Sequence, residues 1–219
     1  MSKNKHICVI LSGCGFLDGA EIHEAVCSLL YISQNGGTYE VAAPDKDQHH
    51  VVNHHNGEEV QETRNVRIEA ARIARGPVKD IKEVNADDYD ALFMPGGFGA
   101  AKNLSTFAFE GANGTIDSEV QRVILDFHSK KKPIGAVCIA PAVLALALGK
   151  GNLTIGTDQG TAEAIEKLGP THKNCPVTEA IVDIENKIVT APAYMADAPI
   201  HDVAAGIEQA VQSVLNLCS

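Results

Sequence analysis

Short apolar runs alternate with amphipathic segments along almost the whole chain, and this alternation constrains the fold more than any other feature. The apolar runs expected to form buried strands are 6–11, 39–43, 90–94 and 134–137, and the segments with helical periodicity are 20–34, 64–74, 117–130 and 140–148. Strands separated by helices favour a doubly wound, mostly parallel sheet with right-handed crossovers and helices on both faces. We therefore expect an α/β fold that forms one domain over residues 1–219.

The rest of the chain continues the alternation with shorter elements. These are a loop or small hairpin in the polar stretch 45–62, a strand at 153–156, a helix at 161–168, a hairpin of 180–184 with 187–191, and a closing helix at 202–217. In sheets of this kind the ligand binds beyond the carboxyl ends of the strands. We therefore expect the chemistry just after Leu11, Met94 and Val137.

Charge and cysteine content exclude several classes of function. The 219 residues hold 18 Lys and Arg against 28 Asp and Glu, a net charge of −10, whereas nucleic-acid binding needs a basic face. The longest apolar stretch, 136–148, is too short to span a bilayer, and the polar start gives no signal-peptide core. The 6 cysteines are scattered without a CxxC pair. This favours free thiols in a reducing cytoplasm.

Cys138 lies between the expected strand 134–137 and the helix 140–148. So short a strand-to-helix connection forces a sharp, strained turn that presents the side chain at the sheet edge. Pro141 suits the first helical turn, since its missing N–H would have no partner there. The thiol then faces the positive end of the helix dipole, so we expect its pKa to fall from roughly 8.5 to between about 4 and 7. This geometry indicates a nucleophile; a small buried residue filling the strand end is the alternative.

Two further segments at strand ends complete a possible active site. In Pro95-Gly96-Gly97-Phe98-Gly99, amides without a Cβ beside them can join the N–H of Ile139 in an oxyanion hole, although a turn that needs glycine dihedral angles is the alternative. In Glu21-Ile22-His23-Glu24, a carboxyl group walled by apolar side chains would have a raised pKa and could exchange protons with a substrate on Cys138. Acidic residues in a first helical turn also interact with the helix dipole, which is the simpler interpretation of this segment alone.

Two further patterns in the sequence compete with this interpretation. The loop 13–19 follows a strand as a dinucleotide-binding loop would, but its spacing is GxGxxxG, and Asp18 and the acidic helix start would repel a pyrophosphate. Its Cys14 lies at the same rim as Cys138 and is a candidate pocket residue. Four histidines between 49 and 55 lack a carboxylate or cysteine at metal-ligand spacing, so we expect a solvated loop and no metal site.

Four segments together resemble a known family. They are ILSGCG at 10–15, AEIHE at 20–24, MPGGFGAAKNL at 94–104 and CIAP at 138–141. The chain is similar to the enhancing lycopene biosynthesis (ElbB) proteins of the class I glutamine amidotransferase-like superfamily, which also holds PfpI-type and glyoxalase III-type proteins. The similarity extends over essentially the whole chain, including 153–158 and 190–195.

This resemblance implies a flavodoxin-like fold, a homodimer and a cofactor-independent glyoxalase, a lyase that converts glyoxal to glycolate and in some members methylglyoxal to lactate. It implies Cys138 as the nucleophile and Glu24, in preference to Glu21, as general acid and base. The implied substrate-binding residues are Gly96, Gly97, Ile139, Cys14 and Asp158. The family name also implies a link to the yield of isoprenoid and carotenoid biosynthesis.

Two departures from relatives limit what carries over. PfpI-type peptidases have a histidine directly after the cysteine, but Ile139 stands there, so a peptidase or glutaminase triad is not expected. Several relatives carry a histidine where this chain has Asp158, which leaves His201 and Tyr194 as candidates for a third catalytic group. A function of another class stays open, a redox-sensing or interaction protein whose Cys138 is oxidised, because low-pKa exposed thiols also oxidise readily.

Overall fold

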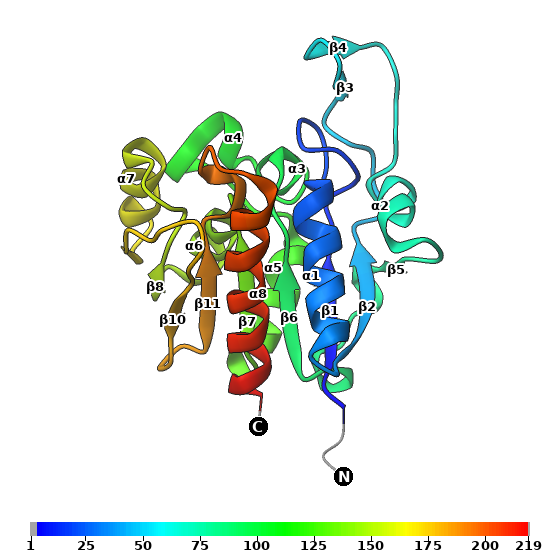
Figure 1. The fold of residues 1–219 in the computed structure, drawn as a ribbon. Coiled ribbons are helices and arrows are strands. Elements are labelled where there is room, and N and C mark those ends of the chain that lie inside the picture. Colours follow the sequence, from blue (N-terminus) through cyan, green and yellow to red (C-terminus); the bar gives the residue numbers. More distant parts are fainter. Residues whose placement is uncertain (1–3, 219) are drawn as a thin grey trace.

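A seven-stranded sheet forms the centre of the computed structural model, which describes residues 4–218 (Figure 1). In sheet order the strands are β10 (Ile181–Asp183), β11 (Ile188–Ala191), β7 (Ile134–Val137), β6 (Ala91–Met94), β1 (His6–Ile10), β2 (Thr38–Ala43) and β5 (Lys79–Asp80). β10 and β11 pair as an antiparallel hairpin, and the other pairings in the sheet are parallel. The central order β2, β1, β6, β7, β11 is flavodoxin-like, with its topological switch between β1 and β6. The prediction of a doubly wound, mostly parallel sheet is confirmed.

Helices cover both faces of this sheet (Figure 1). α1 (Ile22–Gln34), α2 (Val66–Ala74) and α8 (Ile200–Leu217) contribute to the core on one face, and α5 (Ser118–Ser129) and α6 (Ala140–Leu148) to the core on the other. Side chains of β1 alternate between the two cores as the two-residue period of a strand requires, with Ile7 and Val9 on the α1 side and Cys8 and Ile10 on the α5 side. Both faces of the strand are therefore buried, which explains its uninterrupted apolar sequence.

Shorter elements complete the fold around the sheet. They are the hairpin of β3 (Val51–Asn53) with β4 (Glu58–Val60), α3 (Phe98–Lys102), α4 (Phe107–Glu110), α7 (Gln159–Lys167), β8 (Asn152–Leu153) and β9 (Thr171–His172). The β3–β4 hairpin, expected in the polar stretch 45–62, projects from the body of the molecule (Figure 1). Among residues 4–218 no helix is both long enough and apolar enough to cross a membrane.

The expected strand at 153–156 is mostly absent. β8 ends at Leu153 and pairs with β9 in a separate two-stranded sheet. Beyond it, the Thr154 N–H donates to Thr190 Oγ1 over 2.9 Å, and the Gly156 N–H donates to Thr154 Oγ1 over 2.9 Å. Side-chain hydroxyls therefore take the place of a neighbouring strand, and Gly156, with φ of 96°, turns the chain toward α7.

Candidate active site

A cavity of about 410 Å³ contains the side chain of Cys138. Its lining residues are Phe16, Glu21, Gly97, Phe98, Cys138, Ile139, Asp158, Thr161, Tyr194 and Met195. Most of them follow the carboxyl ends of β1, β6, β7 and β11, where a doubly wound sheet binds ligands, and Asp158 and Thr161 stand at the start of α7. An adjoining hollow of about 620 Å³ shares Phe16, Glu21, Tyr194 and Met195 with this cavity and adds His23 and Asp197 to its walls.

Cys138 is held in a strained backbone conformation at the end of β7. Its φ is 60°, in the left-handed region that residues with a Cβ rarely adopt, and its N–H donates to the Ala191 carbonyl over 3.0 Å. α6 begins two residues later at Ala140, with Pro141 in the first turn. The expected sharp turn is confirmed. Strain of this kind persists only where the surrounding structure enforces it, and it is common at active sites.

Glu24, from the first turn of α1, is completely buried beside the cysteine. Its Oε2 accepts the Gly96 N–H over 2.9 Å, its Oε1 accepts the Tyr194 N–H over 3.1 Å, and the Cys138 thiol hydrogen-bonds to the carboxylate. Burial raises the pKa of Glu24 to about 7 even though these hydrogen bonds act to lower it. The expected rise in pKa is therefore confirmed.

The expectation of a lowered pKa for the Cys138 thiol is wrong. Burial, and then the negative charge of Glu24, raise the pKa of this thiol well above its ordinary value. The N–H groups of Gly97 and Ile139 bond to the sulfur and act in the opposite direction, but they do not prevail. The helix start does supply favourable amides, while the desolvation of a wholly enclosed thiolate outweighs them.

Gly96 allows the thiol and the carboxylate to approach each other. A Cβ at this position would lie 2.4 Å from Cys138 Cβ, 2.9 Å from Cys138 Sγ and 2.9 Å from Glu24 Oε2. Gly97, with φ of 92°, then directs its N–H to the sulfur. The two glycines therefore have different tasks, since one leaves room for the pair and the other supplies an oxyanion-type donor.

The remaining candidate residues separate into those at the cavity and those away from it. Asp158 lines the cavity and accepts the Thr161 N–H over 2.8 Å as the N-cap of α7, and Tyr194 also lines it. The His201 side chain is 78% exposed and pairs with Asp202, so it is not a third catalytic group in this arrangement.

Cys14 is also not among the lining residues, contrary to expectation. Gly13 and Gly15, with φ of 114° and 121°, turn the chain so that the charges of Glu69 and Arg72 on α2 act on the thiol of Cys14. A position next to a strand end in the sequence therefore did not place this side chain among the cavity residues, because the backbone conformation at Gly13 and Gly15 directs it elsewhere.

Sequence reasoning missed His23 and the two phenylalanines of the cavity wall. His23 Nδ1 lies 2.9 Å from Tyr194 Oη, and Phe16 and Phe98 line the cavity on the side of the 13–19 loop and α3. His23 stands directly before Glu24, and Phe98 directly follows the glycine pair. These positions, directly next to predicted site residues, were the only signal in the sequence that could have identified His23 and Phe98 as part of the site.

The loop 13–19 is not free to bind a pyrophosphate. The N–H of Gly15 donates to the Ala20 carbonyl over 2.8 Å, and the N–H of Gly19 donates to the Gly15 carbonyl over 2.6 Å. Asp18 is 3% exposed and accepts the Val52 N–H over 2.8 Å. The amides that would hold a dinucleotide are therefore engaged within the protein, and a buried carboxylate stands beside them. Within residues 4–218, no three His, Cys, Asp or Glu side chains gather as metal ligands would.

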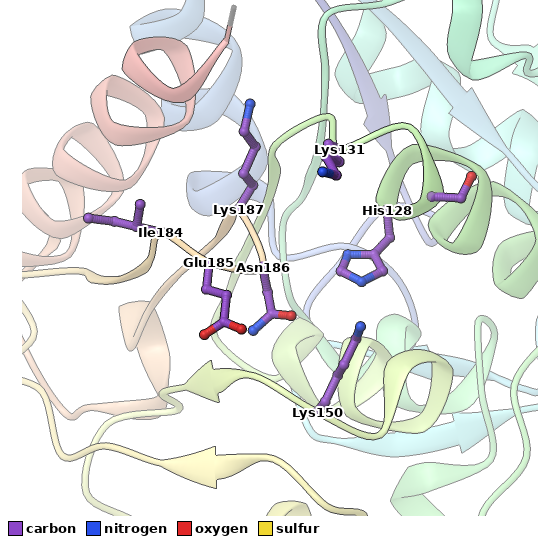
Figure 2. A pocket seen from close by; sticks show the side chains of 8 residues that line it. His128, Lys131, Lys150, Ile184, Glu185, Asn186 and Lys187 are labelled. Carbon is purple, nitrogen blue, oxygen red and sulfur yellow. The ribbon is translucent and has the colours of Figure 1, made fainter.

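A further cavity, of about 480 Å³, lies near the amino end of β7, at the opposite end of the sheet (Figure 2). Figure 2 shows His128 and Lys150 beside the turn that carries Glu185 and Asn186. Cys138, at the carboxyl end of the same strand, does not reach it. Ligands of such sheets bind at the carboxyl end. The Cys138 cavity is therefore the candidate active site.

Comparison with known proteins agrees with this geometry. The chain is 45% identical to the rat (Rattus norvegicus) "ES1 protein homolog, mitochondrial", over 96% of this chain and 83% of that protein. It is 45% identical to the human (Homo sapiens) "Glutamine amidotransferase-like class 1 domain-containing protein 3, mitochondrial", over 96% and 82%. A crystal structure of an "isoprenoid biosynthesis protein with amidotransferase-like domain" from Ehrlichia chaffeensis is 40% identical and has a TM-score of 0.90, covering 96% of this chain and 99% of that one. Residues 10–196 match the DJ-1/PfpI family, and the chain therefore belongs to that family.

Proposed function

We propose that this protein is a cofactor-independent glyoxalase of the ElbB group, which converts glyoxal to glycolate and methylglyoxal to lactate. The observation that carries the proposal is the buried pair of Cys138 and Glu24, in which the pKa of the carboxyl group is raised to about 7. A general acid and base is most effective when its pKa is close to the working pH. The description of the Ehrlichia chaffeensis relative as an isoprenoid biosynthesis protein supports the ElbB assignment.

In the first step the sulfur of Cys138 attacks one aldehyde carbon of glyoxal. Because the pKa of the thiol is raised, it needs a base, and the Glu24 carboxylate accepts the thiol proton as the carbon–sulfur bond forms. The carbonyl oxygen becomes an oxyanion, which the N–H groups of Gly97 and Ile139 stabilise. Glu24 then gives this proton to the oxyanion, which forms a hemithioacetal and leaves the carboxylate ionised for the next step.

In the second step Glu24 moves a proton between the two carbons of the substrate. It removes the C–H proton of the hemithioacetal carbon and delivers it to the neighbouring carbon, while the hydroxyl proton of the first carbon passes to the carbonyl oxygen of the second. The first carbon is thereby oxidised to a thioester and the second reduced to an alcohol. Water then hydrolyses the thioester, releasing glycolate and the free thiol. Oxidation and reduction occur within one molecule, so the reaction consumes no nicotinamide.

The test is glycolate formation from glyoxal by the purified protein without added cofactor, measured by NMR. We expect turnover by the wild type, none by Cys138→Ser, and a loss of about 10² to 10⁴ in kcat with retained KM for Glu24→Gln. Cys218→Ser, at the far end of α8, is the matched control and should keep full activity. Equal rates for wild type and Cys138→Ser, or no turnover by the wild type, would overturn the proposal.

A non-catalytic redox-sensing role for Cys138 is less well supported. The thiolate is the species that oxidants attack, and burial and Glu24 raise the pKa of this thiol. A buried thiol paired with a general base suits catalysis better than sensing.

We also propose that residues 1–219 fold as one domain and act in the cytoplasm as a homodimer. The 6 cysteines are all free, as expected in a reducing compartment. The rat and human relatives are named as mitochondrial proteins, so a mitochondrial location is the alternative that the test must exclude. Cell fractionation and light scattering of the purified protein would test location and assembly.

A further inference from the structure

We infer that the Cys138 cavity excludes anionic carbonyl compounds and selects uncharged and cationic ones, with Glu21 and Asp158 as the residues that determine this specificity. The inference deepens the proposed function, because it names the substrate class of the same site.

Charge on the cavity wall is of one sign. Among the lining side chains, all within residues 4–218, those of Glu21 and Asp158 are carboxylates and none belongs to Lys, Arg or His. The adjoining hollow adds the carboxylate of Asp197 and the imidazole of His23, which is bound to Tyr194. A substrate carboxylate, phosphate or diphosphate would therefore enter without a positive partner, and buried or half-buried charges need one.

Both carboxylates are fixed in position by the helices that they cap. Glu21 Oε2 accepts the Glu24 N–H at the start of α1 over 2.7 Å, and Asp158 Oδ2 accepts the Thr161 N–H at the start of α7 over 2.8 Å. The bonds from Thr161 also lower the pKa of Asp158, so this carboxylate is ionised at neutral pH. Neither group can swing away from an incoming anion without losing its cap.

The aromatic wall favours the same sign of ligand. Phe16 and Phe98 are each 46% exposed, and the face of an aromatic ring attracts cations and repels anions. The Phe98 ring already makes a cation–π contact with Lys102, whose Nζ lies 4.9 Å from the ring centroid. Lys102 also donates to the Leu17 carbonyl over 3.0 Å, and it is not among the residues that line the cavity.

The cavity has room for more than a two-carbon dialdehyde. Its volume of about 410 Å³ falls in the range of sites for whole small molecules. The reacting aldehyde belongs at Cys138, and a substituent beyond it would lie between the phenylalanine rings and the carboxylates. Glyoxal, methylglyoxal and amine-bearing oxoaldehydes fit this description, whereas glyoxylate, 2-oxo acids and isoprenoid diphosphates do not.

Alkylthiolating reagents test the charge of the cavity independently of turnover. Three methanethiosulfonates that differ in the tail, trimethylammonium-ethyl, ethyl and sulfonatoethyl, each react with a thiolate to form a mixed disulfide and release methanesulfinate. The rate at the Cys138 peptide is followed by mass spectrometry and divided by the rate with mercaptoethanol. We expect the cationic reagent to exceed the anionic one by at least about threefold, because Asp158 is exposed and water screens its charge.

Matched variants separate the cavity carboxylates from the net charge of −10. Asp158→Asn keeps the cap acceptor and removes the charge, and it should lower the cation-to-anion ratio about threefold. Glu185→Gln removes the same charge in the cavity of Figure 2 and should leave the ratio unchanged. Glu21→Gln is the second variant if Asp158→Asn does not fold. A wild-type ratio near one, or equal ratios in wild type and Asp158→Asn, would overturn the inference.

Turnover distinguishes this inference from the function on which it rests. If glyoxal is consumed but the reagents react at equal normalised rates, the glyoxalase proposal stands and the charge selection is wrong. If the reagent ratio is large while glyoxal is not consumed, the charge selection stands and the glyoxalase proposal is wrong. If both hold, methylglyoxal should exceed an anionic 2-oxoaldehyde, 4,5-dioxopentanoate, in kcat/KM, and Asp158→Asn should narrow that gap.

Discussion

Gly96 lies beside the Cys138 thiol and the Glu24 carboxylate and leaves the space in which they come into contact, which the proposed reaction requires. The space that its missing Cβ would occupy lies 2.9 Å from both Cys138 Sγ and Glu24 Oε2. A methyl group there must displace backbone-anchored neighbours, because Cys138 is fixed by its strained turn and Glu24 by two N–H donors. At this scale the chemistry depends on an absent side chain as much as on those present.

Gly96→Ala should therefore abolish glyoxal turnover and lower the free energy of unfolding by about 1–3 kcal/mol, the usual cost of overpacking a buried site. Gly76→Ala is the matched control, because a Cβ at Gly76 meets no atom within 4 Å. Glycolate formation and urea unfolding measure the two effects. Full activity in Gly96→Ala would contradict the tight approach of the pair.

Single residues also show which properties of the site could be predicted from the sequence and which could not. The position of Cys138 and a carboxyl group within 21–24 could be predicted, because strand ends and helix starts can be recognised locally, while the choice of Glu24 over Glu21 came from the family resemblance. The direction of the Cys138 pKa could not, because it depends on burial by segments far away in the chain. Cys14 was misplaced for a similar reason, since two glycines with positive φ decide where its side chain points.

At the scale of elements, Asn103 at the end of α3 joins three segments around the site. It is 3% exposed; its Nδ2 donates to the carbonyls of Ser12 and Asp18 over 2.9 and 2.8 Å, and its Oδ1 accepts the His49 N–H over 2.9 Å. These bonds connect α3 to the loop after β1 and to the segment that leads into the β3–β4 hairpin. The side-chain amide of Asn103 therefore connects the end of α3, the helix that follows Gly96 and Gly97, to the glycine-containing loop after β1.

Asn103→Ala should lower the free energy of unfolding by about 2–3 kcal/mol, because it leaves buried carbonyls and an N–H without partners. Asn113→Ala, at an exposed position after α4, should change it by less than about 0.5 kcal/mol. Urea unfolding followed by circular dichroism measures both values. Similar values for the two variants would show that the amide does not hold these segments together.

Long elements could be predicted and short ones could not. α6 and β7 have the expected boundaries, because both are apolar segments with clear ends in the sequence. β7 begins after Pro133, and α6 has Pro141 in its first turn and ends before Gly149. α3 and α4, with 5 and 4 residues, are too short to show a helical period. β5, with 2 residues, is recognisable only by its pairing with β2.

At the scale of the whole molecule, the site is assembled from both halves of the chain. Glu24 and Gly96 come from the first half and Cys138 and Tyr194 from the second, and the bond from the Tyr194 N–H to Glu24 spans 170 residues. Parallel pairing brings these strand ends to one edge only when the complete sheet has formed. Burial of Glu24, and with it the raised pKa, is therefore a property of the folded state.

This coupling makes stability depend on pH. Glu24 has a pKa of about 7 in the folded protein and 4.5 as its ordinary value, so between these pH values the folded state retains a proton that the unfolded state has lost. Stability therefore falls as pH rises through this window, by about 3 kcal/mol in total. Glu24→Gln does not titrate, so its free energy of unfolding relative to wild type should rise by that amount from pH 4.5 to pH 8, as measured by urea unfolding. The exposed Glu163→Gln should give a constant difference, and a constant difference for Glu24→Gln as well would contradict the raised pKa.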